Sequence, residues 1–155
     1  MTDAEKIAYK NTLKQWALDS IRSRISTAKE AMSQAQEAAN SEEKSSAGDK
    51  YETGRAMGHL QKDMHARQLA ESVKELAALQ AIPIDALCPD GRPGALLRGD
   101  DIAFFISAGL GKQTIEGRSV VFLSPLAPLA AMLHGKKAGD KVPFNKTAVC
   151  IREVF

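Results

Sequence analysis

The sequence predicts an α+β chain, in which a long antiparallel helical hairpin (a coiled coil) precedes a small antiparallel β domain with one short helix. All 6 prolines and all 5 phenylalanines lie after Ile82. The residues before that point are rich in Ala, Gln, Glu, Lys and Arg, which favour helices. We therefore expect a hairpin over residues 1–81, a linker over 82–93 and a β domain over 94–155.

The first helix is indicated by apolar residues that recur at steps of three and four. Thr2 or Asp3 is suited to cap its start, with Glu5 just inside. The apolar side chains become smaller toward residue 40, so a partner helix must approach more closely there. The stripe consists of Leu13, Ala17, Ile21, Ile25, Ala28, Met32, Ala35 and Ala39.

A second apolar stripe predicts the returning helix, with a five-residue step from Met64 to Leu69. Between the stripes, residues 40–50 are polar and include Gly48, a composition typical of a turn. Two helices joined so closely should be antiparallel neighbours. The second stripe consists of Met57, Leu60, Met64, Leu69, Val73, Leu76 and Leu79.

The β domain is indicated by short apolar runs separated by turn residues. We expect turns at 109–112 and 116–117, and a helix within 125–133 that Pro128 opens and Gly135 ends. Strands are expected at 95–98, 102–107, 119–123, 141–144 and 148–154. The expected core is Phe104, Ile106, Val121, Leu129, Leu133, Val149 and Ile151.

Composition limits the function classes. The 21 basic and 19 acidic residues give a formal net charge of +2, which argues against coating nucleic acid by bulk charge. The sequence has no apolar run of about 18 residues, so we expect no membrane span and a cytoplasmic protein. Two cysteines are too few for a disulfide framework.

Several catalytic motifs fail. Ile106 stands where a Walker loop before Gly111-Lys112 needs its first glycine. His59 and His65 are six residues apart and do not share a helix face as zinc ligands would. The sequence therefore indicates no self-contained catalytic site.

The turn of the predicted hairpin is acidic. Asp49 and Glu52 are three residues apart and project from one helix face, and Glu42 and Glu43 lie across the turn. Acidic residues at a helix start complement the helix dipole, which is one explanation. The other is that they hold a divalent cation such as Mg²⁺, with a partner supplying the remaining ligands.

The chain resembles the bacterial Gre-type transcript cleavage factors over nearly its whole length. The segment Ala127-Pro-Leu-Ala-Ala-Met-Leu-His-Gly-Lys-Lys-Ala-Gly-Asp140 is similar to the family's Ser-Pro-Ile-Ala-x-x-Leu-x-Gly-Lys-Lys-x-Gly-Asp. Asp49 and Glu52 match the family's Asp-x-x-Glu at the turn, but Thr53-Gly-Arg-Ala56 replaces its Asn-Ala-Glu-Tyr. This departure leaves open whether the protein stimulates cleavage.

The resemblance implies an FKBP-like C-terminal domain that docks on RNA polymerase beside the secondary channel. The hairpin would enter the channel, where Asp49 and Glu52 would share a Mg²⁺ with the polymerase, which then hydrolyses backtracked RNA. The nascent RNA would be contacted only indirectly, and the protein would be a cofactor and not an enzyme. Lys44, Lys50 and Arg55 would face RNA or polymerase, or simply solvent.

The expected docking residues are Pro128, Leu129, Leu133, Gly135, Lys136, Lys137, Gly139 and Asp140. Two alternatives remain beside cleavage stimulation. A protein of this shape can occupy the channel and inhibit or modulate the polymerase without cleavage. An unrelated interaction protein can dimerise through its hairpin; otherwise we expect a monomer.

Overall fold

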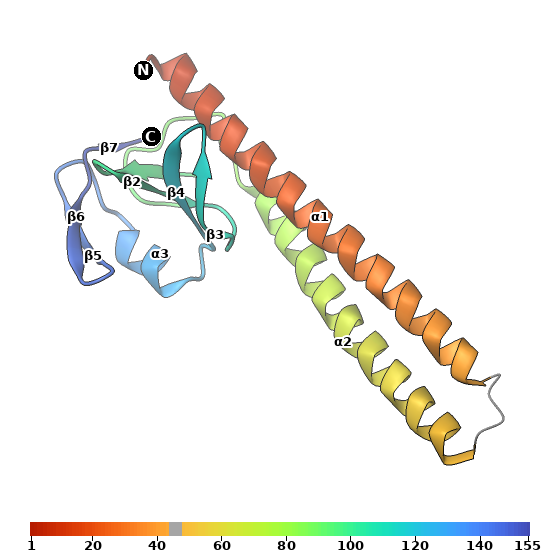
Figure 1. The fold of residues 1–155 in the computed structure, drawn as a ribbon. Helices are drawn as coiled ribbons and strands as arrows, with labels where there is room; N and C mark the ends of the chain where they lie inside the picture. The colour runs from red at the N-terminus through yellow and green to blue at the C-terminus, as the bar shows by residue number, and fades with distance from the viewer. Residues whose placement is uncertain (44–47) are drawn as a thin grey trace. The chain divides into compact units, whose positions relative to one another are not determined.

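The computed structural model describes the backbone of residues 1–43 and 48–155 and the side chains of residues 1–41 and 56–155. Over this part of the chain the fold is α+β, as predicted (Figure 1). The helices are α1 (Asp3–Glu43), α2 (Gly48–Ala81) and α3 (Pro128–Leu133). The strands are β1 (Leu96–Arg98), β2 (Ile102–Ile106), β3 (Gly111–Ile115), β4 (Arg118–Leu123), β5 (Lys141–Phe144), β6 (Thr147–Cys150) and β7 (Glu153–Val154).

The described chain falls into two compact units. The sheet unit consists of Met1–Leu18 and Ala78–Phe155, and the helical unit of Asp19–Ala77. Composition placed residues 1–81 together, whereas contacts group the first 18 residues with the sheet. None of the helices, over the residues described, is long and apolar enough to cross a bilayer.

The start of α1 is closed by a capping box. The Thr2 hydroxyl accepts from the Glu5 amide at 3.2 Å, and the Glu5 carboxylate accepts from the Thr2 amide at 2.8 Å. Six members of the predicted stripe are buried, and Ile25 and Met32 are half-buried. The apolar face predicted for α1 is therefore confirmed.

In the helical unit, α1 and α2 lie side by side and run antiparallel. Arg24 lies 3.7 Å from Glu75, and the Lys62 amine donates to Gln36 at 2.8 Å. Further along α1 the two helices approach closely, because a Cβ added to Gly58 would lie 2.9 Å from the Cβ of Ala39. This close approach matches the taper of the α1 stripe toward alanine.

The prediction for the inner face of α2 is wrong in its first half. Met57, Leu60 and Met64 are 52%, 60% and 48% exposed, and Val73 is also exposed. Because Gly58 turns toward Ala39, the neighbouring face with the larger side chains points outward. Seven of the nine shielded positions described in α2 follow each other at steps of four and three, as in a heptad repeat. They are Gly58, Lys62, His65, Leu69, Ser72, Leu76 and Leu79; the other two are Ala66 and Glu75.

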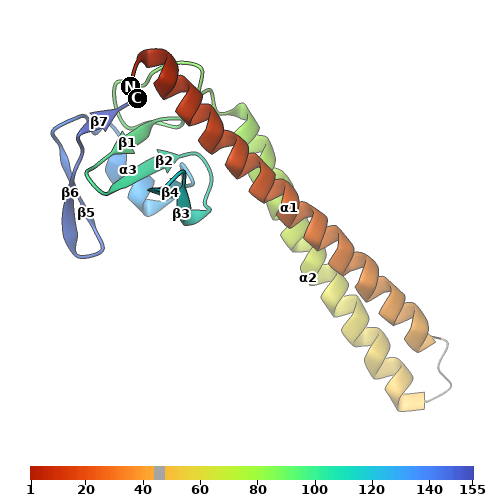
Figure 2. The ribbon, with the colours of Figure 1, turned by 45° about the horizontal axis from the view of Figure 1, so that its top comes forward.

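The main sheet has the strand order β3-β4-β2-β1-β7, and β5 pairs only with β6 (Figure 2). The sheet is mixed and not wholly antiparallel, because β2 and β4 pair in parallel, with Phe104 beside Val121. The reason is β3, which the sequence analysis missed. In sequence, β3 lies between β2 and β4, and it pairs antiparallel with β4. Because the chain reverses direction twice between β2 and β4, these two strands run parallel. The expected strand at 148–154 is also divided, between β6 and β7.

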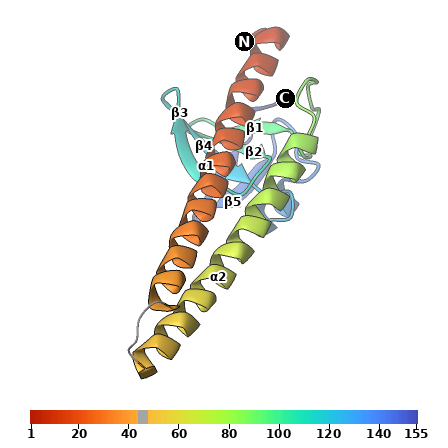
Figure 3. The same ribbon diagram turned by 90° about the vertical axis from the view of Figure 1, so that its right-hand side faces the viewer.

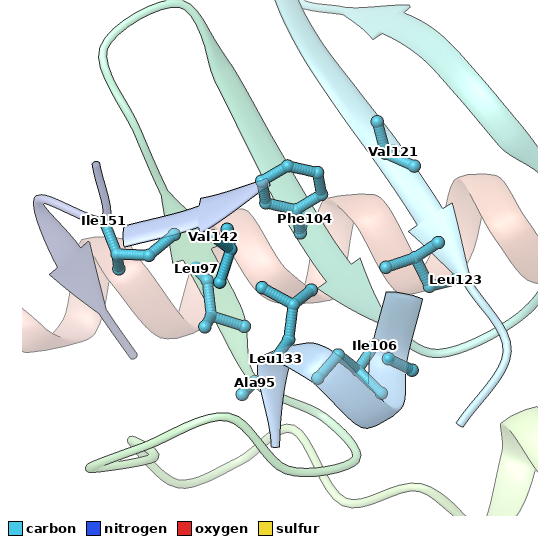
Figure 4. Packing of buried hydrophobic residues seen from close by; sticks show 10 residues of the cluster. Ala95, Leu97, Phe104, Ile106, Val121, Leu123, Leu133, Val142 and Ile151 are labelled. Carbon is cyan, nitrogen blue, oxygen red and sulfur yellow. The ribbon is translucent and has the colours of Figure 1, made fainter. Parts of the chain in front are cut away.

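One face of the sheet packs on α3 and the β5–β6 ribbon. Figure 4 shows Leu133 of α3 among side chains from the strands. Five of the seven predicted core residues are buried in this cluster, and Leu129 and Val149 are half-buried against it. The α3 bounds agree with the prediction, since Pro128 opens the helix and Gly135 follows it at φ +74°.

The opposite face of the sheet packs on the first turns of α1 (Figure 3). The Trp16 ring stacks on Phe122 with 5.1 Å between centroids, and Phe105 meets Phe122 edge-on. Leu13 and Ala17 are fully buried. Burial on both faces explains why β2 and β4 read as continuous apolar runs, Ile-Ala-Phe-Phe-Ile and Val-Val-Phe-Leu.

An ion-pair cluster joins α1 to the edge of this sheet. The Glu153 carboxylate on β7 lies 2.6 Å from the Lys6 amine of α1 and accepts from the Arg98 guanidinium of β1 at 2.5 Å. The hydrogen bond from Lys6 holds the pKa of Glu153 below its ordinary value, with Arg98 acting in the same direction and burial opposing. The ionised carboxylate therefore stabilises the fold.

We expect Glu153→Gln to lower the free energy of unfolding by about 1–2 kcal/mol at pH 7. Because the folded-state pKa is depressed, this stability is fully present above the unfolded value of about 4.3 and is lost as the pH falls below it. The stability difference between wild type and variant should therefore shrink between about pH 5 and pH 3 in urea titrations. A difference that is constant over that range would contradict the ion-pair role.

Candidate functional site

The carboxylates expected to hold a metal lie at the start of α2. The helix begins at Gly48, so Asp49 and Glu52 belong to its first turns, and Glu42 and Glu43 to the last turn of α1. The side chains at these four positions lie outside the described residues, as do those of Lys44, Lys50 and Arg55. Their orientation therefore stays a prediction.

The donor set at the start of α2 fits a hard cation. Residues three apart on a helix share one face, and carboxylate oxygens are the ligands that Mg²⁺ prefers. Two carboxylates fill only part of its coordination sphere, so the remaining ligands must come from water, phosphate or a partner.

Beyond these positions, α2 carries an exposed apolar patch. Met57, Leu60 and Met64 follow each other at steps of three and four on one outward face of the helix. A helix whose inner face already contacts α1 needs no second apolar face for its own stability. We therefore count this patch as a candidate partner surface.

The segment expected to dock on a partner, residues 128–140, lies in the sheet unit. Pro128, Gly135, Lys137, Gly139 and Asp140 are exposed, and Leu129 and Lys136 are half-buried. Leu133, predicted both as a core residue and as a docking residue, is fully buried in the core and supports the segment from beneath. Leu126, which precedes this segment and is 94% exposed, and Met132, 45% exposed, were missed; both are large apolar side chains at the surface.

Hydrogen bonds hold the middle and the C-terminal end of this segment. The Gly135 amide donates to the Gly91 carbonyl at 2.8 Å, and the Gly91 amide donates to the Lys136 carbonyl at 2.9 Å. At the C-terminal end, the Asp140 carboxylate accepts from the Lys137 amide, and the Gly139 amide donates to the Ile151 carbonyl. The exposed side chains therefore stand on a held backbone, which lowers the entropy cost of binding.

A polar hollow of about 530 Å³ lies elsewhere in the sheet unit, between Tyr9 and the turns that precede β2 and β4. Its arginines are already engaged. Arg98 pairs with Glu153, Arg152 makes two hydrogen bonds to Asp100 that lower the pKa of that carboxyl, and Arg118 lies over the Tyr9 ring at 5.4 Å. Burial raises the pKa of the Tyr9 phenol, so it is neutral at pH 7. The three arginines of the hollow are therefore already engaged with other side chains and not free to bind an anion.

The histidines do not gather. His65 faces the shielded side of α2 and lies 3.3 Å from Gln68, His59 is exposed, and His134 ends α3. Among the side chains that the structure describes, no three His, Cys, Asp or Glu residues are arranged to hold a metal ion. Asp49 and Glu52 fall outside that set.

Comparison of the chain with protein-family models and with curated protein sequences gives no match in either case.

The position of the segment 128–140 depends on a glycine at position 91. A Cβ built there would lie 1.8 Å from the Leu133 carbonyl oxygen, a backbone atom that can yield only if α3 or the linker moves. We expect Gly91→Ala to lower the free energy of unfolding by about 1–3 kcal/mol. Urea denaturation measures the change.

Gly109→Ala is the matched control. A Cβ there meets only ordinary contacts, at 3.8 Å and 3.9 Å from Ser124. Its effect should stay within about 0.5 kcal/mol. Equal losses in the two variants would show that the approach of Gly91 to Leu133 does not matter.

Proposed function

We propose that this protein is a Gre-like transcription elongation factor that binds RNA polymerase at its secondary channel and stimulates cleavage of backtracked transcripts. In this proposal α1 and α2 form the helical hairpin that enters the channel, and the sheet unit is the FKBP-like docking domain. The cleaving active centre belongs to the polymerase.

The observation that carries the proposal is the position at which α2 begins. With Gly48 as the first helical residue, Asp49 and Glu52 occupy the end of a helix that continues through the helical unit to Ala77. At about 1.5 Å per residue, the axis from Asp49 to Ala77 is about 42 Å long. Two carboxylates at the start of such a helix can therefore reach a site that lies about 42 Å from the other end of the helical unit.

The chemistry requires little of the protein itself. When bound, a second Mg²⁺ would stabilise the attacking oxygen in an in-line displacement at phosphorus. Asp49 and Glu52 would supply oxygen ligands that position the ion. If only one of the two carboxylates is a ligand, the other would orient a water.

Docking on the polymerase would use the exposed part of residues 126–140. Leu126 and Met132 supply apolar contacts and Lys137 a positive charge, on a backbone held by Gly91 and Ile151. The outward patch of Met57, Leu60 and Met64 would lie along the channel wall. Binding to the polymerase would explain why both surfaces expose apolar side chains that the fold itself does not need.

A second function is favoured by the sequence after the carboxylates. Thr53-Gly-Arg-Ala56 departs from the Gre pattern and introduces a basic residue, Arg55, one turn from Glu52. A channel-binding protein with this end could slow the polymerase without stimulating cleavage. The experiment below separates the two functions.

In a backtracked elongation complex, we expect the wild-type protein to accelerate loss of the RNA 3′ end at least tenfold. Asp49→Asn and Glu52→Gln should each abolish the acceleration, because an amide oxygen is a poorer Mg²⁺ ligand than a carboxylate. Gel electrophoresis of end-labelled RNA measures the rate, and Glu30→Gln, on the exposed side of α1, is the control. Slowed synthesis with no cleavage would support the inhibitor; no effect, with a concentration-dependent dimer, would support the dimerising protein.

The docking surface makes a separate prediction about affinity. Leu126→Glu and Lys137→Glu should each weaken binding to RNA polymerase at least tenfold in a fluorescence anisotropy titration. Lys112→Glu makes the same charge change at an exposed position on β3 and should alter the affinity less than twofold. Equal effects of Lys112→Glu and Lys137→Glu would mean that only net charge matters, and would exclude this segment as the docking surface.

A further inference from the structure

Lys10 is a fully buried lysine that forms no ion pair with the described side chains. Its side chain has no exposed surface, and its amine donates to the Ala86 carbonyl at 3.1 Å. Charged groups are rarely buried in this way, because losing water costs several kcal/mol unless an opposite charge compensates.

The second neighbour of the Lys10 amine is a thiol. Cys88 is a free, half-buried cysteine whose Sγ lies 3.8 Å from the Lys10 Nζ. Burial lowers the pKa of Lys10, while the nearby Cys88 and Asp85 oppose that shift. A larger fraction of the lysine is therefore the neutral amine, which is the nucleophilic form.

Both groups are held in place. Lys10 belongs to the part of α1 that packs on the sheet, and Cys88 packs against the core at the start of a fixed segment. In that segment Arg92 is bound to Asp90 at 2.7 Å, and Gly91 is bonded to Gly135 and Lys136. Two reactive groups fixed at contact distance react as if at very high concentration.

We propose that Lys10 and Cys88 are a modification site, at which hydrogen peroxide forms a sulfenamide cross-link between the lysine nitrogen and the cysteine sulfur. Peroxide first oxidises the Cys88 thiol to a sulfenic acid and is itself reduced to water. The Lys10 amine then attacks the sulfur, the S–N bond forms, the S–O bond breaks, and the oxygen leaves as water with one proton from the amine.

The net reaction converts one thiol, one amine and one peroxide into one sulfenamide and two waters. The sulfur loses two electrons and the peroxide gains them, so no other reactant is needed. The link joins α1 to the segment after α2, across 78 positions of sequence. It also removes the sulfenic acid before a second peroxide can oxidise it irreversibly to the sulfinic acid.

The test uses the full chain with Cys150→Ser, which removes the only route to a disulfide within one molecule. After treatment with hydrogen peroxide, we expect an intact mass about 2 Da lower, which dithiothreitol restores. Protease digestion should release a peptide containing Lys10 linked to one containing Cys88. Cross-link formation should leave little sulfenic acid for dimedone to trap.

Two lysine variants in the same background complete the test. Lys10→Met removes the amine, so Cys88 should instead gain about 16 Da or 32 Da and react with dimedone. Lys14→Met is the matched control, since Lys14 also donates to backbone carbonyls, those of Gln80 and Ile82, and its cross-linking should be unchanged. Dimedone-reactive or sulfinic Cys88 without a linked Lys10 peptide in the Cys150→Ser protein would overturn the proposal, as would an unmodified thiol.

Discussion

The fold depends on burial of the sheet from both sides. The face that carries Phe105 and Phe122 would be an exposed apolar surface without the first turns of α1, where Leu13, Trp16 and Ala17 cover it. α1 continues without a break to Glu43, so one helix supplies residues to both units. Lys14 donates hydrogen bonds to the carbonyls of Gln80 and Ile82 at the end of α2. The last carbonyls of a helix have no amide donor within the helix, so these bonds satisfy acceptors that would otherwise be unpaired there. These hydrogen bonds join α1 to the end of α2 within the sheet unit.

The sequence predicted the elements with strong local signals. The Thr2 cap, the α1 stripe, and α3 between Pro128 and Gly135 follow from side-chain chemistry within a few residues. The sequence did not predict β3, because Gly-Lys-Gln-Thr-Ile is an exposed edge strand with no apolar alternation. Without β3, the parallel pairing of β2 with β4 could not be predicted either. The inner face of α2 was misassigned because a glycine and polar residues occupy it, so its packing depends on the backbone approach to Ala39.

The candidate site was predicted in part. The Ala127–Asp140 segment lies largely at the surface, and Leu133 is in the core as the sequence predicted, but no sequence signal marked Leu126 and Met132 as the exposed apolar side chains. The continuous apolar runs of β2 and β4 were a signal for two-sided burial. No sequence signal pairs Lys10 with Cys88, because only the fold brings together residues that are 78 positions apart. The roles proposed for Asp49 and Glu52 rest on residue type, spacing and the start of α2.

The most direct measurement of the proposed function locates the start of α2 within a polymerase complex. An iron chelate attached at Glu52→Cys, in a protein with Cys88→Ser and Cys150→Ser, produces hydroxyl radicals that cut only nearby nucleic acid. In a backtracked elongation complex, we expect scission of the transcript near its 3′ end from this position. The same chelate attached at Lys112→Cys on β3 should produce none there. Absence of 3′-proximal scission from position 52, in a protein shown to bind the polymerase, would contradict delivery of these carboxylates to the active centre.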